Sequence, residues 1–401
     1  MTASAKNNWG IIISLLLLGG VIAMRTSISN QTFSPERTNF TTFWLAGRML
    51  LEDKNPYNEA QYLGEHDLYN VQWRPNKIFP YPLPLAILCV PFGLFSIRTA
   101  YLGWVVTSQI IVIITVFVLL KHLGTKEHNR LLVPIFISLT FFGPLYLTLL
   151  TGSIGALTLL VLLGVILLLE RDMPILAGIL LALTMLKPPQ GVTILLLAGI
   201  WFLARRDWKA ISGVALGGIG LFLVAMIQDP QWIGKFFTAT QAVMDRTQGV
   251  HSNVWAFSYL ACGGASPCST LLGAAGNVTM LGLGGFFLWK KKSQLSAWEA
   301  FNIIIPIGFV STIYLWAYDQ LPYIIPIVWI IGTLLVHTKS YIHAFIFLIA
   351  LEVFSFYALA QQAATNKDLW SLGTTVIVFG TTMGLIYLKT KRLTNQPSLK
   401  T

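Results

Sequence analysis

The sequence predicts an all-α fold of the polytopic membrane class, and three observations support this prediction. The chain of 401 residues is 55% hydrophobic, and its mean hydropathy is +0.68. Apolar runs long enough to cross roughly 30 Å of hydrocarbon as helix recur along it. Ten-residue segments of alternating polarity, which are typical of membrane barrels, are absent from the sequence. We therefore expect helices, which satisfy their own backbone hydrogen bonds in lipid.

About twelve membrane helices are expected, with both chain ends on the cytoplasmic side. The first apolar run, Trp9 to Met24, has no small-residue cleavage site after it, so we expect it to be retained as a helix. Residues 1–401 would then form a single integral membrane domain. The expected spans are residues 10–27, 99–121, 132–150, 154–170, 174–187, 189–204, 209–227, 271–288, 299–316, 321–337, 342–361 and 369–388.

Residues 81–97 are the segment whose placement decides the topology. The segment is short, contains three prolines and follows Pro80. If it spans the membrane, the basic loops 121–130 and 205–209 both fall outside. If it instead enters from the outer face and turns back, every strongly basic loop is cytoplasmic, as the distribution of Lys and Arg in membrane proteins favours. We prefer this re-entrant or interfacial segment, which would help to wall a cavity because irregular backbone at membrane depth needs protein or water beside it.

The charge distribution excludes several classes of function. The net charge is +11, but Lys and Arg concentrate in short loops such as 121–130, 205–209, 290–292 and 389–392, a pattern typical of cytoplasmic loops rather than of nucleic-acid contact. No Gly-rich phosphate loop is present, so direct use of ATP or a sugar nucleotide is not expected. His and Cys residues show no metal-ligand spacing, and we expect no metal and no cofactor.

Two polar segments, residues 28–80 and 228–270, are expected on the outer face. The first combines acidic, basic, aromatic and amide side chains in a chain that is only 11% charged. A short helix should begin near Asn39–Thr42, lie in the membrane interface and stop at Asn55-Pro56-Tyr57. Such a helix either seals the bundle or contributes to a site. In the second segment Cys262 and Cys268 flank a Gly-rich stretch and could form a disulfide.

Lys187 interrupts two apolar half-helices in the stretch LALTMLKPPQGVTILLL. The two following prolines break the helix, and a broken helix exposes free backbone groups toward a cavity. A lysine at such a place needs a partner or a polar ligand, and it binds phosphate well as a point charge. We therefore predict anion binding. The alternative is a connecting turn from which Lys187 extends its ammonium to the interface.

Asp319 lies in the stretch LWAYDQLPY between two apolar runs. An aromatic belt explains the neighbouring rings of Trp316, Tyr318 and Tyr323, but not the aspartate. A carboxylate at a membrane-embedded cavity can act as a general base or bind sugar hydroxyls. The alternative is an ordinary acid of a loop.

Short motifs spread over residues 28–335 follow an order found in a known family. They are Phe40, Phe43-Trp44, Ala46-Gly47-Arg48, Leu51, Asn55-Pro56-Tyr57, Tyr81-Pro82, Ala177-Gly178, Lys187-Pro188, Asn253 and Tyr318-Asp319. In order and spacing these motifs resemble glycosyltransferase family 87. The resemblance implies the C-type membrane glycosyltransferase fold and a donor sugar, often mannose, carried on polyprenyl phosphate.

The resemblance also implies roles for individual residues. Lys187, with Arg48 as a second cation, would hold the departing polyprenyl phosphate, while a base accepts the proton of the acceptor hydroxyl. The presumed catalytic aspartate of the family aligns with Asn39, whose amide cannot titrate near neutral pH. Either Glu36 or Asp319 supplies the base, or the chain binds without catalysis, or the alignment is displaced by a few residues. We further expect substrate contacts from Trp44, Tyr57, Tyr81, Gln190, His251, Asn253 and Tyr318.

The expected function is therefore that of a bacterial plasma-membrane hexosyltransferase with its site on the outer face. The hexose, with mannose as first candidate, would pass from the polyprenyl-phosphate donor to a lipid or glycan acceptor. Membrane lipids would surround the protein, and no nucleic-acid partner is expected. A transporter or flippase for a lipid-linked sugar or solute is one alternative, which a helix broken at Lys187 would suit. A non-catalytic family member, suggested by Asn39, is another. Sugar, acceptor, linkage and oligomeric state stay open.

Overall fold

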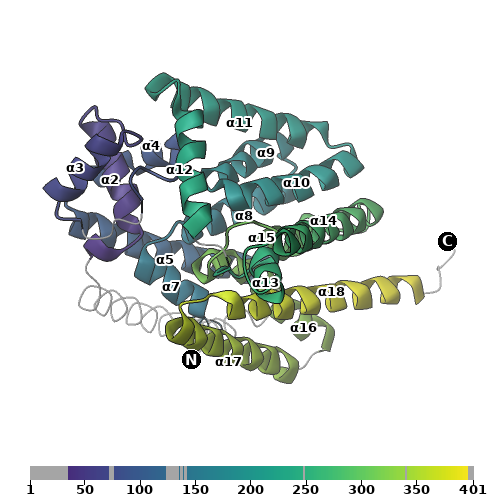
Figure 1. Ribbon diagram of the computed structural model, residues 1–401. Helices are drawn as coiled ribbons and strands as arrows, with labels where there is room; N and C mark the ends of the chain where they lie inside the picture. The colour runs from purple at the N-terminus through teal and green to yellow at the C-terminus, as the bar shows by residue number, and fades with distance from the viewer. Residues whose placement is uncertain are drawn as a thin grey trace, which may run out of the picture.

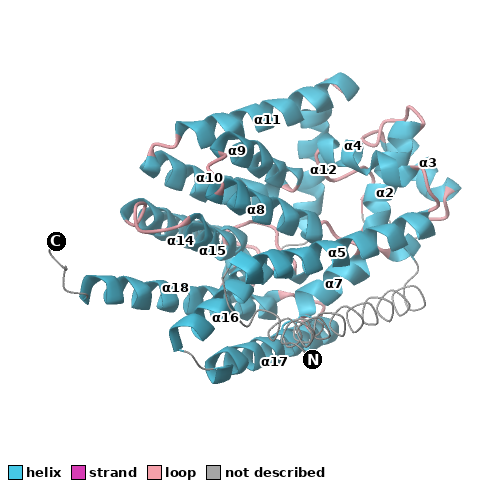
Figure 2. Cartoon of the chain, turned by 180° about the vertical axis from the view of Figure 1, so that it is seen from behind, coloured by secondary structure: helices cyan, strands magenta, loops and turns pink. Residues whose placement is uncertain are grey.

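The computed structural model describes residues 35–71, 76–122, 135, 139, 142–246, 249–338 and 341–395. Over these residues the fold is all-α, and loops connect helices without any strand (Figure 2). The elements are η1 Pro35–Arg37, α2 Phe40–Leu51, α3 Glu59–Leu68, α4 Leu83–Gly93, α5 Ile97–His122, α7 Gly143–Thr151, α8 Gly155–Glu170, α9 Pro174–Ala182, η2 Leu183–Leu186, α10 Pro188–Arg205, α11 Trp208–Gln228, α12 Trp232–Arg246, α13 Val254–Ala261, α14 Pro267–Lys290, α15 Ala297–Val310, η3 Ala317–Tyr323, α16 Ile324–Thr338, α17 Tyr341–Thr365, η4 Leu369–Ser371 and α18 Leu372–Asn395.

Six segments of the described chain are long and apolar enough to cross a membrane. Shorter apolar helices lie at Leu83–Gly93, Gly155–Glu170, Pro174–Leu186 and Ala297–Val310. The protein is therefore a helical membrane protein, but twelve spans are not confirmed. The six segments are Ile97–His122, Trp208–Gln228, Pro267–Lys290, Ala317–Leu335, Tyr341–Thr365 and Leu369–Lys389.

Several expected spans differ from the helices in the structure. The expected span 10–27 lies outside the described residues, as does part of 132–150, of which α7 is the described helical end. The expected span 299–316 was too long, because α15 ends at Val310 and the chain then runs in turns to η3. Hydrophobicity alone does not show where such a turn begins.

The segment 81–97, whose last residue already belongs to α5, contains the 11-residue helix α4. At 1.5 Å per residue this helix extends roughly 17 Å, which is too short to cross the hydrocarbon. It packs against α2 with almost no space between the two backbones. A Cβ atom added at Gly47 would lie 2.5 Å from the carbonyl oxygen of Cys89, and one added at Gly93 would lie 2.7 Å from the backbone nitrogen of Arg48. Small residues thus let α2 and α4 form one unit.

Helix α2 is buried within the protein, and its expected position in the membrane interface stays a prediction. All its residues from Phe40 to Gly47 are buried, because α4 covers one side and the α7–α8 turn meets its first residue. Asn39 occupies the N-cap position, but its side chain makes no capping hydrogen bond. The helix ends at Leu51, ahead of the expected Asn55-Pro56-Tyr57 stop, and Asp53 then adopts a φ of 53°.

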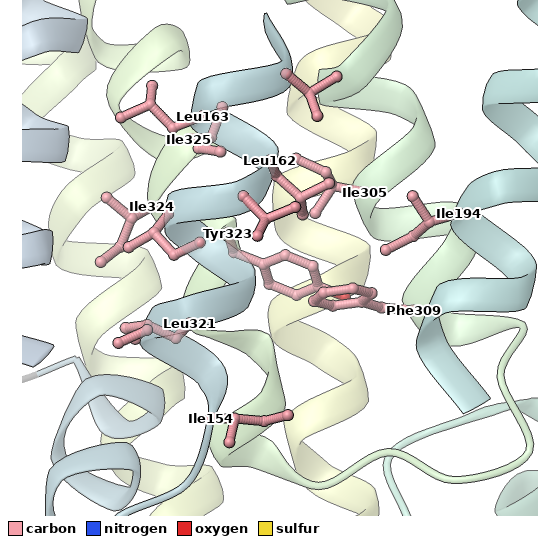
Figure 3. Packing of buried hydrophobic residues seen from close by; sticks show 14 of the residues in the cluster. Ile154, Leu162, Leu163, Ile194, Ile305, Phe309, Leu321, Tyr323, Ile324 and Ile325 are labelled. Carbon is pink, nitrogen blue, oxygen red and sulfur yellow. The ribbon is translucent and has the colours of Figure 1, made fainter. Parts of the chain in front are cut away.

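The remaining helices form a bundle beside the α2–α4 unit, and α12 crosses between the two at a steep angle to α9, α10 and α11 (Figure 1). The core lies around η3 and α16. There the ring centroids of Phe309 and Tyr323 are 5.6 Å apart, and Ile194, Leu162 and Ile305 surround them (Figure 3). This packing fixes the start of the Ala317–Leu335 span inside the protein.

The second polar segment contains α12 and α13. Its two cysteines, Cys262 and Cys268, form a disulfide, as their spacing allowed. Gly263 and Gly264 between them have φ values of 71° and 134°, which only glycine adopts readily.

Candidate active site

The candidate site is built around the helix break at Lys187. Helix α9 continues into the 3₁₀ turn η2, Lys187 follows with φ −129° and ψ 81°, and α10 starts at Pro188. Pro188 and Pro189 occupy the first helical positions, where a missing N–H costs nothing. A residue before proline avoids the helical conformation, so the sequence itself turns Lys187 out of the helix. Lys187 is nevertheless only 4% exposed.

Lys187 forms a buried ion pair with Asp319. The ammonium contacts the carboxylate through Nζ and Oδ1, and Asp319 is only 1% exposed. The other oxygen, Oδ2, accepts the backbone N–H of Trp316 at 3.1 Å. The rings of Tyr318 and Tyr314 have their centroids 5.2 and 5.8 Å from Nζ, within the range of a cation–π contact. Pairing offsets the large cost of burying both charges.

Hydrogen bonds between α10 and the end of α15 hold the helix break in place. Thr193 Oγ1 donates to the carbonyl of Gly308 at 2.7 Å, and Thr312 Oγ1 donates to the carbonyl of Pro189. Because Thr312 is only two residues before Tyr314, the same contact also places the first aromatic residue beside Lys187.

A cavity of about 590 Å³ opens beside this ion pair. Its wall includes residues from the start of α2 and from the helix break. Of its described wall residues, only Arg37 and Lys187 carry a charge, and both are cations. The wall consists of Arg37, Thr38, Asn39, Thr42, Asn76, Pro80, Tyr81, Leu147, Leu150, Thr151, Lys187, Pro188, Pro189, Phe236, Thr240, Val243, Tyr314, Trp316, Tyr318, Gln362 and Asn366.

The structure brings four of the predicted site residues to this one cavity. Asn39, Tyr81, Lys187 and Tyr318 all line it. Asp319 does not line it, but reaches it through the ion pair with Lys187. These residues come from four separate parts of the sequence.

Two further predicted residues lie behind the aromatic wall. His251 packs against Tyr314 and Trp316, with ring centroids 4.5 and 5.1 Å apart. Burial and the nearby charge of Lys187 lower the pKa of His251 to about 4, so it is neutral at neutral pH. Asn253 accepts the N–H of Ala256 at the start of α13 and donates to the carbonyl of Thr312 at 2.9 Å. Both therefore support the wall rather than line it.

Arg48 is not brought to the cavity. Its guanidinium bonds Glu52 Oε1 at 2.7 Å, the hydroxyl of Tyr69 at 3.0 Å and the carbonyl of Gly93 at 3.0 Å. It lies nine positions after Asn39 on α2, so the two point to roughly opposite sides of the helix at 3.6 residues per turn. Lys54 also bonds Glu52 and, with Arg48 and Tyr69, lowers the pKa of that carboxyl to about 2. Arg48 therefore belongs to a separate ion-pair network with Glu52 and Lys54, which does not line the cavity.

The other predicted residues also lie off the wall. Trp44 donates its indole N–H to the carbonyl of Phe95, and Tyr57 donates its hydroxyl to the carbonyl of Tyr81 at 2.5 Å. Glu36 lies in η1 beside Arg37 and is partly buried, outside the set of wall residues. Gln190 is buried in the first turn of α10, and its Nε2 atom has no hydrogen-bond partner in the described part of the chain.

Sequence reasoning missed one cation and one wall of the site. Arg37 was passed over because a single arginine within a polar segment carries no distinguishing pattern. The wall formed by α12 had a signal, since Phe236, Thr240 and Val243 are four and three positions apart and so fall on one helix face. Two amides near the end of α17, Gln362 and Asn366, complete the wall.

The fold and the site together define a helical membrane protein with a cationic, aromatic-walled cavity. Residues 79–313 match glycosyltransferase family 87, and because this stretch covers more than half of the chain, the protein belongs to that family. It is thus a membrane glycosyltransferase. Lys187 lies inside the matched stretch, while Asn39 and Asp319 lie outside it. Among curated proteins no match to the chain was found.

Proposed function

We propose that this glycosyltransferase moves a hexose from a polyprenyl-phosphate donor to a lipid or glycan acceptor in the cavity beside Lys187. The observation that carries the proposal is the buried Lys187–Asp319 pair, of which Lys187 lines that cavity and Asp319 lies directly behind it. A phosphate-linked sugar needs a cation for its phosphate and a base for the acceptor, and this pair supplies one of each. Mannose is the first candidate for the sugar, and we propose the C-type fold on the resemblance of the motifs.

The reaction uses the two charges in turn. When the donor phosphate enters, the ammonium of Lys187 turns toward it and releases the carboxylate of Asp319. The acceptor oxygen then forms a bond to the anomeric carbon while the bond from that carbon to the phosphate oxygen breaks. The electron pair goes to the phosphate, whose charge Lys187 and Arg37 stabilise. The acceptor proton goes to Asp319.

Asn39 shares the cavity with Lys187, and its amide can hydrogen-bond sugar hydroxyls but cannot take the proton. Its place on the wall also favours a second candidate function, binding of the lipid-linked sugar without transfer. Glu36, three residues before Asn39 in the sequence, does not line the cavity. Asp319 is therefore the preferred base, because it already contacts the phosphate-binding cation.

The distribution of basic residues supports a site on the outer face of a bacterial plasma membrane. Helix α10 has 18 residues, so it separates Lys187 from Arg205 by roughly 27 Å. Arg205 donates to the carbonyl of Lys292, and nearby at the end of α18 Lys389 pairs with Glu299. The cations thus gather opposite the cavity, and cations gather on the cytoplasmic side. A polyprenyl-phosphate donor, loaded from the lipid, fits such a site.

The direct test is transfer from radiolabelled polyprenyl-phosphate mannose to a membrane lipid extract by the purified protein. We expect a labelled product that is lost in Lys187→Ala and in Asp319→Asn. Glu59→Gln is the matched control, because the Glu59 side chain is 54% exposed and pairs with the exposed Lys77. Product formation that survives both site substitutions overturns the site. Donor binding without any product would instead favour the non-catalytic function.

A further inference from the structure

A buried carboxylate outside the cavity lies in the short connection between α17 and η4. Asp368 is 1% exposed, and its position follows the matched family stretch by more than fifty residues. One carboxylate oxygen, Oδ2, accepts the backbone N–H of Ala317. The other, Oδ1, accepts the hydroxyl of Ser371 at 2.9 Å. Its own backbone N–H donates to the carbonyl of Val250 at 2.7 Å.

Two of these bonds, to Ala317 and to Val250, tie the segment that carries the aromatic wall to the segment that supports it from behind. Val250 precedes His251, whose ring packs on Tyr314 and Trp316. Ala317 lies between Trp316 and Tyr318, two residues before Asp319. Asp368 therefore connects the segment around Val250 and His251 with the segment around Ala317, which carries Trp316, Tyr318 and the candidate base Asp319.

A second set of bonds reinforces the same junction. Gln320 Nε2 donates to the carbonyl of Ser371 at 3.0 Å and to Ser252 Oγ at 3.3 Å. The N–H of Ser252 donates to the carbonyl of Leu315 at 3.0 Å. The N–H of Ala317 precedes the first intrahelical bond of η3, so without Asp368 it would be a buried donor in need of a partner. Asp368 thus orients the first turn of η3.

We propose that Asp368 is a positioning residue of the transfer reaction, which holds η3 so that Asp319 meets Lys187 and Tyr318 faces the cavity. The inference rests on the proposed function. Asp368 itself does not line the cavity and acts through Ala317. The amide of Asn366, two residues earlier in the same connection, does line the cavity, so this connection contributes to the site at both points.

The kinetic test compares Asp368→Ala with Asp368→Asn in the transfer assay. The alanine variant should lower kcat about tenfold or more while the KM for the donor changes about threefold at most, since Lys187 and Arg37 remain on the wall. The asparagine variant keeps an oxygen for the Ala317 N–H and should return kcat to within about threefold of the unchanged protein. Equal loss in both variants, or unchanged kcat in the alanine variant, overturns the proposal.

A chemical test of the same proposal does not depend on transfer. Acetic anhydride labels accessible amines, and Lys77, whose side chain is 78% exposed, is the internal standard. Lys187 should stay protected in the unchanged protein and in Asp368→Asn, and should become labelled in Asp368→Ala once η3 shifts and Asp319 leaves it. Equal protection of Lys187 in all three proteins contradicts the positioning role.

The outcomes separate this inference from the proposed function. If the unchanged protein shows no transfer activity, this result counts against the proposed function alone. The labelling of Lys187 still tests the positioning role of Asp368. If Asp368→Ala does not purify as a folded protein, Ser371→Ala replaces it. That variant removes one hydrogen-bond donor to the Asp368 carboxylate and keeps the bond to Ala317. Labelling of Lys187 in Ser371→Ala should therefore be measurably higher than in the unchanged protein, but lower than expected for complete loss of the carboxylate. No increase in Ser371→Ala then overturns the proposal.

Discussion

The ammonium of Lys187 and the carboxylate of Asp319, 132 residues apart in the chain, form an ion pair that is almost completely buried. One partner comes from a helix broken by two prolines and the other from a 3₁₀ turn at the start of a segment that is long and apolar enough to cross a membrane. Neither charge is stable there alone. Their mutual dependence gives the first prediction.

Removal of either partner should destabilise the protein more than removal of both. Lys187→Ala or Asp319→Ala leaves an uncompensated buried charge, which costs about 3–5 kcal/mol. The double variant removes both charges, so its loss should be clearly smaller than the sum of the two single losses. Thermal unfolding in detergent, followed for all four proteins, measures this coupling. Additive losses would mean that the two groups do not stabilise each other.

A carboxylate introduced at position 39 should take over the role of general base that we propose for Asp319. Asn39 lines the cavity and makes no capping bond, so Asn39→Asp needs no rearrangement of the helix and places a negative charge at the favourable N-terminal end of α2. We expect Asp319→Asn to be inactive and Asn39→Asp in the same chain to regain transfer by about tenfold or more. Initial rates measure it, with Asn39→Ala as the control. No gain in the double variant would assign the base elsewhere.

Loss of Arg48 should affect stability and leave donor binding unchanged. Its guanidinium side chain is 34% exposed and pairs with Glu52, so the pair itself contributes about 1 kcal/mol at most. The bond to the Gly93 carbonyl links α2 to α4 and adds to that loss. Arg48→Ala should therefore lower the melting temperature slightly, with an unchanged KM for the donor. Arg37→Ala is the comparison, and it should raise that KM.

The sequence predicted the long helices well, because a hydrophobic run and its ends are local features. Helix α5 was expected at 99–121 and lies at Ile97–His122, and α10 was expected at 189–204 and lies at Pro188–Arg205. The end of α15 and the turn η3 were not predicted. They depend on tertiary bonds such as that from Thr312 to Pro189, which no local pattern records.

The candidate site could be predicted from the sequence only where the type of a residue differs sharply from that of its neighbours. Lys187 and Asp319 interrupt apolar runs, and a charge in such a place needs an explanation. Arg37 and Arg48 lie in a polar segment, where position alone does not separate a cavity residue from a structural ion pair. Whether such a residue lines the cavity depends on the side of the helix from which its side chain projects. Arg48 projects from the side of α2 that does not line the cavity.

Gly152 should not tolerate a side chain. It ends α7 with a φ of 62°, and an added Cβ atom would lie 2.5 Å from Cβ of Phe40 and 3.2 Å from the ring of Tyr101. The strained backbone alone costs about 1–2 kcal/mol, and displacement of Phe40 would move the start of α2 and with it Asn39. Gly152→Ala should lower both melting temperature and transfer rate. Gly199→Ala, where an added Cβ meets nothing within 4 Å, is the matched control and should be neutral or slightly stabilising.

The stability of the protein should depend on pH through Asp368. Burial, with a smaller contribution from the nearby charge of Asp319, raises the pKa of Asp368 from 3.8 to about 7, although the bonds from Ser371 and Ala317 oppose the shift. The folded protein therefore holds this proton more tightly than the unfolded chain does. The stability that this provides is fully present below about pH 4 and is lost as the pH rises toward 7. Asp368→Asn does not titrate, so its melting temperature relative to the unchanged protein should rise between pH 5 and pH 8. A difference that stays constant over this range would show that Asp368 is already ionised at pH 5.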